Sequence, residues 1–138
     1  MSEASLPAIL PAGSKRADTV GFNRFSGPLY GLPDDGDLTR FAFIAEHKHL
    51  NGSGNVHGGM LMTLADVAMS RTTRMKGGST RPSTVSLSCD FVSGAKLGEL
   101  IEARVRIVRQ TRTLMFMSAG IACGERPVMN ASGLWKIA

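Results

Sequence analysis

The clearest structural pattern in the chain is HGGMLMTLADVAM, residues 57–69. Two glycines open it, and apolar residues then recur at intervals of three and four. The positions with this helical spacing are Leu61, Leu64, Ala65 and Ala68. They predict one amphipathic helix from Gly58 to about Met75. The Lys-Gly-Gly at residues 76–78 predicts its end, because a glycine commonly follows the last helical turn.

One carboxylate stands in the middle of this apolar run. Asp66 is the only charged side chain between His57 and Arg71. An unpaired carboxylate is costly to bury, so an aspartate in such a setting usually marks a functional site rather than a solvated helix face. We therefore interpret Asp66 as the leading candidate for a catalytic residue.

A period of two replaces the helical spacing after residue 78. Alternating apolar and polar residues predict four strands, at residues 85–91, 101–107, 114–123 and 128–137. Before the helix, residues 26–45 predict two short strands around the turn Pro-Asp-Asp-Gly at residues 33–36. The chain therefore places one long helix between a strand pair and a run of four strands.

This order has no βα alternation, which excludes a parallel doubly wound sheet. We expect an α+β domain at residues 25–138, with one long central helix packed on a five- to six-stranded antiparallel sheet. Residues 1–24 lack a steady period and predict an extension that is partly ordered at best. Met62, Val67 and Met69 lie on the second side of the helix, which suggests that a second copy of the chain covers it.

The composition is that of an ordinary one-domain globular protein of 138 residues. No apolar run reaches the roughly 18–20 residues that a membrane span needs, and the first residues lack the basic start of a signal peptide. The two cysteines lie far apart and form no metal-binding motif. The net charge of +5 comes without a basic block or a nucleic-acid motif. We expect a cytoplasmic protein that binds neither nucleic acid nor membrane.

The spacing of Asn51, the His-Gly-Gly at residues 57–59 and Asp66 resembles that of the hot dog-fold acyl-CoA thioesterases, in particular the phenylacetic-acid-degradation (PaaI-type) branch. The resemblance continues into SGAKLGELIEARVRIVRQTRTLMFMSAGI, residues 93–121. It implies a hot dog fold, hydrolysis of an acyl-CoA without metal or cofactor, and a homodimer that pairs into a tetramer. It also implies two sites shared across the dimer, in which the aspartate is general base or nucleophile.

The residues themselves fit this chemistry. Amides at a helix start lack intrahelical partners and lie at the positive end of the macrodipole, so Gly58 and Gly59 could donate to a thioester carbonyl that becomes an oxyanion. The side-chain amide of Asn51 could supply a second donor. Asp66 lies eight residues beyond Gly58, about 12 Å along the helix axis. One helix cannot bring both to one carbon, whereas two antiparallel helices from two subunits can.

The remaining candidates have supporting roles. His57 is expected to orient the loop or bond a nearby backbone group, and Thr84 to hold the attacking water, with Ser83 or Ser86 as alternatives for that hydroxyl. Three flexible methionines, together with Gly59, are expected to line the acyl pocket; they are Met60, Met62 and Met69. Four cations at the helix end and at turns suit the phosphates of coenzyme A; they are Lys76, Arg81, Arg109 and Arg112.

Two other functions stay open at this point. A non-catalytic hot dog module could bind acyl-CoA as a sensor, although residues 1–24 are too short for an output domain. A hydratase acting on enoyl thioesters would need a His/Asp pair a few residues apart, whereas His57 and Asp66 are nine apart. The acyl group, and the choice between coenzyme A and acyl carrier protein, cannot be read from the sequence.

Overall fold

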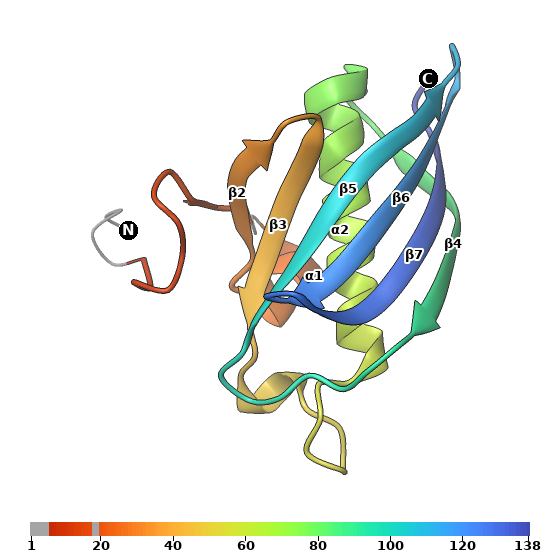
Figure 1. The fold of residues 1–138 in the computed structure, drawn as a ribbon. Coiled ribbons are helices and arrows are strands. Elements are labelled where there is room, and N and C mark those ends of the chain that lie inside the picture. The colour runs from red at the N-terminus through yellow and green to blue at the C-terminus, as the bar shows by residue number, and fades with distance from the viewer. Residues whose placement is uncertain (1–5, 18–19) are drawn as a thin grey trace.

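A seven-stranded antiparallel sheet wraps around one long helix in the computed structural model, which describes residues 6–17 and 20–138 (Figure 1). The strand order is β1-β2-β3-β5-β6-β7-β4. The elements are β1 (Lys15–Arg16), α1 (Gly21–Ser26), β2 (Tyr30–Asp35), β3 (Leu38–Ile44), the 3-10 helix η2 (His47–His49), α2 (Gly58–Gly77), β4 (Ser83–Phe91), β5 (Leu100–Gln110), β6 (Leu114–Cys123) and β7 (Arg126–Lys136). This is the expected α+β architecture, with six long strands and the two-residue β1 as a seventh.

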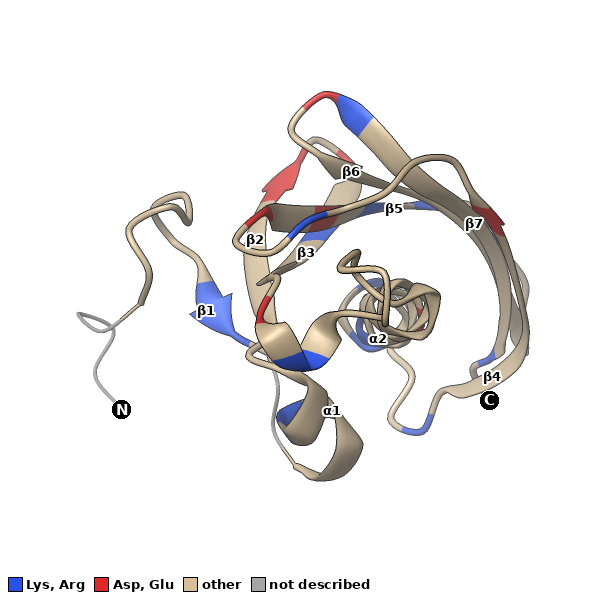
Figure 2. Ribbon diagram, turned by 90° about the horizontal axis from the view of Figure 1, so that it is seen from below, with Lys and Arg blue, Asp and Glu red and all other residues tan. Residues whose placement is uncertain are grey.

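Helix α2 begins and ends where its sequence predicts. It runs from Gly58 to Gly77, and Gly78 follows in the left-handed conformation with φ 69°. The helix lies in the concave side of the sheet, and α1 lies beside it on the side that the sheet leaves open (Figure 2). Trp135 of β7 is fully buried, and its indole Nε1 donates to Ser70 Oγ at 2.8 Å. The sheet and α2 therefore share one core.

Two of the three apolar residues assigned to a second copy of the chain are buried within a single protomer. Val67 is 4% exposed and Met69 is fully buried, whereas Met62 keeps 37% of its surface. Met69 can be buried because residue 133 is a glycine. A Cβ at that position of β7 would collide with the Met69 sulfur and the Trp135 ring. The missing side chain in the sheet makes room for the methionine, so Met69 is a core residue.

Strand β4 lies at an edge of the sheet and pairs only with β7 within the described part of the chain. Its side chains are mostly exposed, including Val85 at 56% and Phe91 at 55%. Exposed apolar edge strands readily pair with another strand. The open edge of β4 is therefore a surface where a second chain could continue the sheet.

The N-terminal segment contributes two elements that the sequence did not predict. Strand β1 pairs with β2, and Arg71 of α2 donates from Nη1 to the Ala17 carbonyl at 3.1 Å. The proposed boundary between residues 24 and 25 falls inside α1 (Gly21–Ser26). Residues 1–5 and 18–19 of the expected extension lie outside the described residues.

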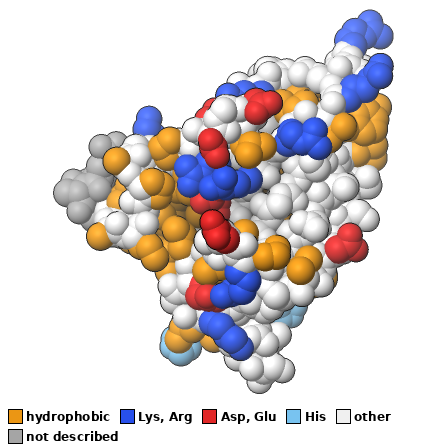
Figure 3. Space-filling model, in the orientation of Figure 1, with side chains coloured by type: hydrophobic (Ala, Val, Ile, Leu, Met, Phe, Trp, Pro, Cys, Tyr) orange, Lys and Arg blue, Asp and Glu red, His pale blue; other side chains and the backbone are white. Residues whose placement is uncertain are grey.

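Acidic and basic side chains lie side by side on the convex face of the sheet, over β2, β3 and β5 (Figure 3). Arg40 donates to both oxygens of Glu102 at 2.8 and 2.9 Å, and Arg104 joins Glu102 to Asp35. Burial alone would raise the pKa of Glu102, but these hydrogen bonds outweigh it and lower the pKa. Arg40 and Arg104 are therefore paired with carboxylates on this face. No helix among the described residues is long and apolar enough to cross a membrane.

Candidate active site

The start of α2 offers one free amide donor. His57 precedes the helix, and its Nδ1 accepts from the Gly59 N–H at 2.8 Å. The Gly58 N–H has no protein partner among residues 6–17 and 20–138. Because His57 satisfies Gly59, only the Gly58 amide remains to bind an oxyanion. His57 bonds a nearby backbone group, one of the two supporting roles that its sequence position suggests.

The loop before α2 orients the side chain of Asn51. Its Oδ1 accepts from the Ser53 and Asn55 amides at 2.9 and 3.1 Å. This is the local turn bonding that asparagine commonly makes. With its oxygen fixed, the Nδ2 group donates to no protein group in the part of the chain that the structure describes. Asn51 is at once a turn residue and a preoriented donor.

Thr84 holds Asp66 by a direct hydrogen bond. Its Oγ1 donates to Asp66 Oδ1 at 2.7 Å. A β-bulge makes this contact possible: Thr84 pairs with Trp135 and Ser86 with Leu134, so Val85 is the extra residue. In a regular strand Thr84 would share the convex face with Ser86. The bulge turns Thr84 toward α2 and selects it over Ser83 and Ser86 as the hydroxyl beside Asp66.

One protomer keeps Asp66 apart from the helix start. The carboxylate is half-buried in a polar hollow of about 460 Å³ beside Ser70, Arg71, Arg74 and Pro82. Gly58 lies eight residues back along the continuous helix, about 12 Å away along its axis. A water beside Asp66 therefore cannot attack a carbon whose oxygen is bound at Gly58 of the same chain.

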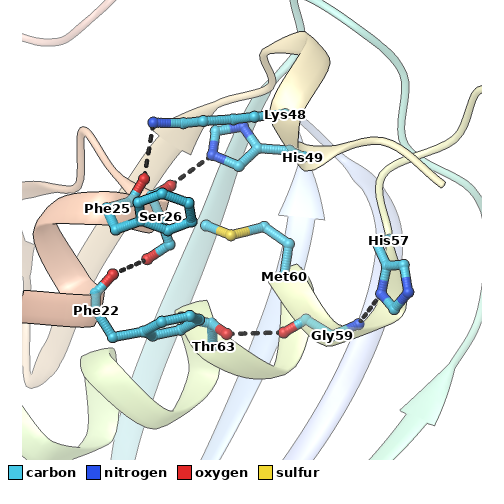
Figure 4. Close-up of a pocket in the computed structure, with 9 residues that line it drawn as sticks. All are labelled: Phe22, Phe25, Ser26, Lys48, His49, His57, Gly59, Met60 and Thr63. Carbon is cyan, nitrogen blue, oxygen red and sulfur yellow. Dashed lines mark hydrogen bonds between the residues drawn. The ribbon is translucent and has the colours of Figure 1, made fainter.

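A second, apolar hollow lies at the helix start. This α1 pocket is lined by Phe22, Phe25, Ser26, Lys48, His49, His57, Gly59, Met60 and Thr63 (Figure 4). Two residues assigned to substrate binding, Gly59 and Met60, lie in its wall, whereas Met62 and the core residue Met69 do not. The sequence did not single out Phe22, Phe25 or His49. Phe22 and Phe25 have the i, i+3 spacing of a helix face, but an element of six residues is too short for this spacing to indicate a helix.

The four cations assigned to phosphate binding lie at the other end of the protomer. Lys76 is at the α2 C-terminus, and its Nζ is bound to Asp34 Oδ2 at 2.7 Å. Arg81 is exposed in the loop before β4, and Arg109 and Arg112 are exposed at the β5–β6 turn. Figure 1 shows the α2 C-terminus and this turn at the end opposite the helix start.

Comparisons with known proteins bear on this arrangement. Residues 53–129, more than half of the chain, match the family described as the thioesterase superfamily. The chain is 33% identical over 112 residues to "Putative esterase PA0474" of Pseudomonas aeruginosa, covering 80% of this chain and 84% of that protein. It is 34% identical over 80 residues to human acyl-coenzyme A thioesterase 13, covering 55% and 54% of the two chains.

Solved structures share the fold at lower identity. A variant of the phenylacetic acid degradation protein PaaI from Thermus thermophilus superposes with a TM-score of 0.73 at 24% identity, covering 85% and 98% of the two chains. A hypothetical thioesterase protein with coenzyme A from Streptococcus pneumoniae gives a TM-score of 0.72 at 23% identity, covering 80% and 88%. The expected hot dog fold is confirmed. The chain belongs to the thioesterase superfamily and is a thioester hydrolase that resembles the PaaI-type branch.

Proposed function

We propose that the chain hydrolyses acyl-CoA to a free acid and coenzyme A, at two sites shared across a homodimer. Each site combines Asp66 and Thr84 of one protomer with Gly58 and Asn51 of its partner. The observation that carries the proposal is the separation along α2 of a held carboxylate and a free amide donor. Each is suited to one half of thioester hydrolysis, and neither can complete the reaction within one chain.

The reaction follows from these groups. Asp66 accepts a proton from a water molecule as the water oxygen bonds to the thioester carbon. The carbonyl electron pair moves onto oxygen, where the Gly58 N–H and the Asn51 Nδ2 donate to the developing charge. When the tetrahedral intermediate collapses, the carbon–sulfur bond breaks. The thiolate of coenzyme A leaves and takes up the proton that Asp66 accepted from the water.

The open edge of β4 supports the dimer. If two β4 edges pair antiparallel about a twofold axis, the sheet continues across the dimer and the two α2 helices run in opposite directions. The exposed Val85 and Phe91 would then be covered. Phe91 already lies against the helix start of its own chain, because a Cβ on Gly58 would lie 3.1 Å from its ring. Pairing at β4 therefore places the partner protomer next to the Gly58 amide.

Coenzyme A as the carrier is supported by two relatives and by charge. One relative is named an acyl-coenzyme A thioesterase, and one structure of the same fold contains coenzyme A. In an antiparallel dimer with Asp66 beside the partner's Gly58, the cationic end of α2 lies about 15 Å beyond that Gly58 along the helix axis. Arg81, Arg109 and Arg112 would then lie on the same side as the thioester.

Replacing Asp66 tests the proposal. Release of coenzyme A thiol from acyl-CoA should fall by at least about a hundredfold in Asp66→Asn, while thermal unfolding stays close to wild type. Asp37→Asn, an exposed carboxylate in the turn between β2 and β3, is the matched control. Asn51→Ala should lower kcat more than it raises KM, because its amide acts on charge that develops in the transition state. Undiminished turnover in Asp66→Asn would refute the assignment.

A further inference from the structure

The α1 pocket is an apolar hollow that stays open in the protomer. Its volume is about 280 Å³, and its walls are the rings of Phe22 and Phe25 and the thioether of Met60 (Figure 4). Phe22 and Phe25 are 65% and 76% exposed, although phenylalanine is usually buried. A concave apolar surface of this kind is suited to an apolar ligand group.

The pocket begins where the proposed site binds the thioester carbonyl. His57 and Gly59 line it, and Gly58 lies between them in the chain. A carbonyl oxygen bound at the Gly58 N–H therefore has the pocket within reach of its acyl chain. At about 30 Å³ per water molecule, the volume equals about nine waters, which gives room for an acyl group of about eight to ten heavy atoms.

Helix α1 is held over the pocket by side chains from η2. His49 Nε2 bonds the Ser26 carbonyl at 2.5 Å, and Lys48 Nζ donates to the Phe25 carbonyl at 2.9 Å. A six-residue helix is too short to be stable by itself. These two bonds at its C-terminal end therefore fix where the aromatic wall lies.

The hydrogen bonds of His49 define which ring nitrogen donates and which accepts. The ring is 3% exposed and makes an edge contact with Phe43, with centroids 4.9 Å apart. Its Nδ1 lies 2.9 Å from the Glu46 amide nitrogen, which can only donate. Nδ1 must therefore accept, and Nε2 carries the hydrogen given to Ser26. The side chain of His49 therefore bridges η2 and α1.

We propose that the α1 pocket receives the acyl group and selects apolar chains of medium length, and that His49 is a positioning residue that sets this selectivity through Ser26. This inference rests on the proposed function. The side chain of His49 bonds Glu46 and Ser26 and contacts Phe43, and only its backbone carbonyl reaches the site, where it accepts from the His57 N–H at 2.7 Å. Its effect on hydrolysis runs through the position of Phe22 and Phe25.

A panel of acetyl-, octanoyl- and palmitoyl-CoA tests the pocket. In the wild type, kcat/KM should be highest for octanoyl-CoA, which fills the pocket. Phe22→Ala and Phe25→Ala should each lower the octanoyl-to-acetyl ratio of kcat/KM by on the order of tenfold, mainly through KM. Val108→Ala changes an exposed apolar residue on β5, 55% accessible and outside the pocket; it is the control and should keep the ratio. An unchanged ratio in both phenylalanine variants would overturn the proposal.

Two substitutions separate positioning from general stability. In His49→Gln the amide nitrogen takes the place of Nε2 and keeps the bond to Ser26, whereas in His49→Asn the amide oxygen takes the place of Nδ1 and keeps the bond from Glu46. We expect the octanoyl-to-acetyl ratio to fall by about tenfold in His49→Asn and to stay within about twofold in His49→Gln. Equal losses in both variants would overturn the positioning role. If neither variant folds, Lys48→Met removes the other bond from η2 to α1. An unchanged octanoyl-to-acetyl ratio in Lys48→Met would then count against the positioning of α1 by η2.

Failure of this inference differs from failure of the proposed function. If Asp66→Asn abolishes hydrolysis while the phenylalanine variants keep the wild-type ratio, the function stands and the pocket assignment fails. If the wild type hydrolyses none of the three thioesters, calorimetric titration of octanoyl-CoA and free coenzyme A decides the pocket. Octanoyl-CoA should then bind about tenfold tighter than coenzyme A, and this preference should disappear in Phe22→Ala. Equal affinities would overturn the inference.

Discussion

Removing the hydroxyl of Thr84 tests how the site holds its base. Thr84→Val keeps the shape of the side chain and deletes the 2.7 Å bond to Asp66 Oδ1. Hydrogen bonds to charged groups contribute roughly 1.5–3 kcal/mol, and the lower end applies because Thr84 is exposed. A loss of about 1.5 kcal/mol in transition-state stabilisation corresponds to about a tenfold fall in kcat/KM.

The assay is release of coenzyme A thiol from octanoyl-CoA, measured over a range of substrate concentrations. We expect the fall in kcat, with KM little changed, because the bond orients the base and does not contact the thioester. Thr84→Ser keeps the hydroxyl and should retain most of the activity. Ser86→Ala, on the opposite face of β4, should behave as wild type. Wild-type kcat in Thr84→Val, together with an inactive Asp66→Asn, would show that the Thr84 hydroxyl does not hold the catalytic carboxylate.

Two further predictions concern stability. The hydrogen bond from the Arg126 guanidinium lowers the pKa of Glu99 to about 2 from its usual 4.5. The folded-state pKa lies below the unfolded value, so this stabilisation is fully present above about pH 4.5 and is lost as the pH falls through about 2. Because solvent screens this partly exposed pair, urea unfolding should show Glu99→Gln less stable than wild type by about 1 kcal/mol at pH 7 and by much less near pH 2; a constant difference would contradict it. Gly133→Ala should lower the free energy of unfolding by about 1–3 kcal/mol, because the added Cβ meets the Trp135 ring and the Met69 sulfur. Gly120→Ala on β6, with open space around it, is the control, and equal melting temperatures for the two would argue against the packing explanation.

The sequence predicted the elements that have strong periods and clear ends. The helical spacing and the glycines at both ends located α2 closely, and alternation located the four strands after it. Elements α1 and β1 were missed because six and two residues are too few to show a period. Their positions depend on contacts from distant residues, such as the bond between Arg71 and the Ala17 carbonyl.

The candidate site was predictable in its residue types and less so in its contacts. A glycine-rich helix start and a lone helix aspartate are visible in the chain. The bulge at Val85, which turns Thr84 toward Asp66, depends on pairing with β7 and leaves no mark on the alternation. Met69 was misassigned to the pocket because its burial depends on the glycine opposite it in the sheet. Such features arise from residue pairs far apart in sequence.

Mixing two impaired variants tests whether each site is shared between protomers. Protomers with Asp66→Ala and protomers with Asn51→Ala are co-expressed with different affinity tags, so that the mixed dimers can be isolated. Each mixed dimer should have one site with both residues intact and one with neither, so its activity should be about half that of the wild type, far above that of either homodimer. If mixed dimers are no more active than the two variants alone, the carboxylate and the amide donors act within one chain, which contradicts a site shared between protomers.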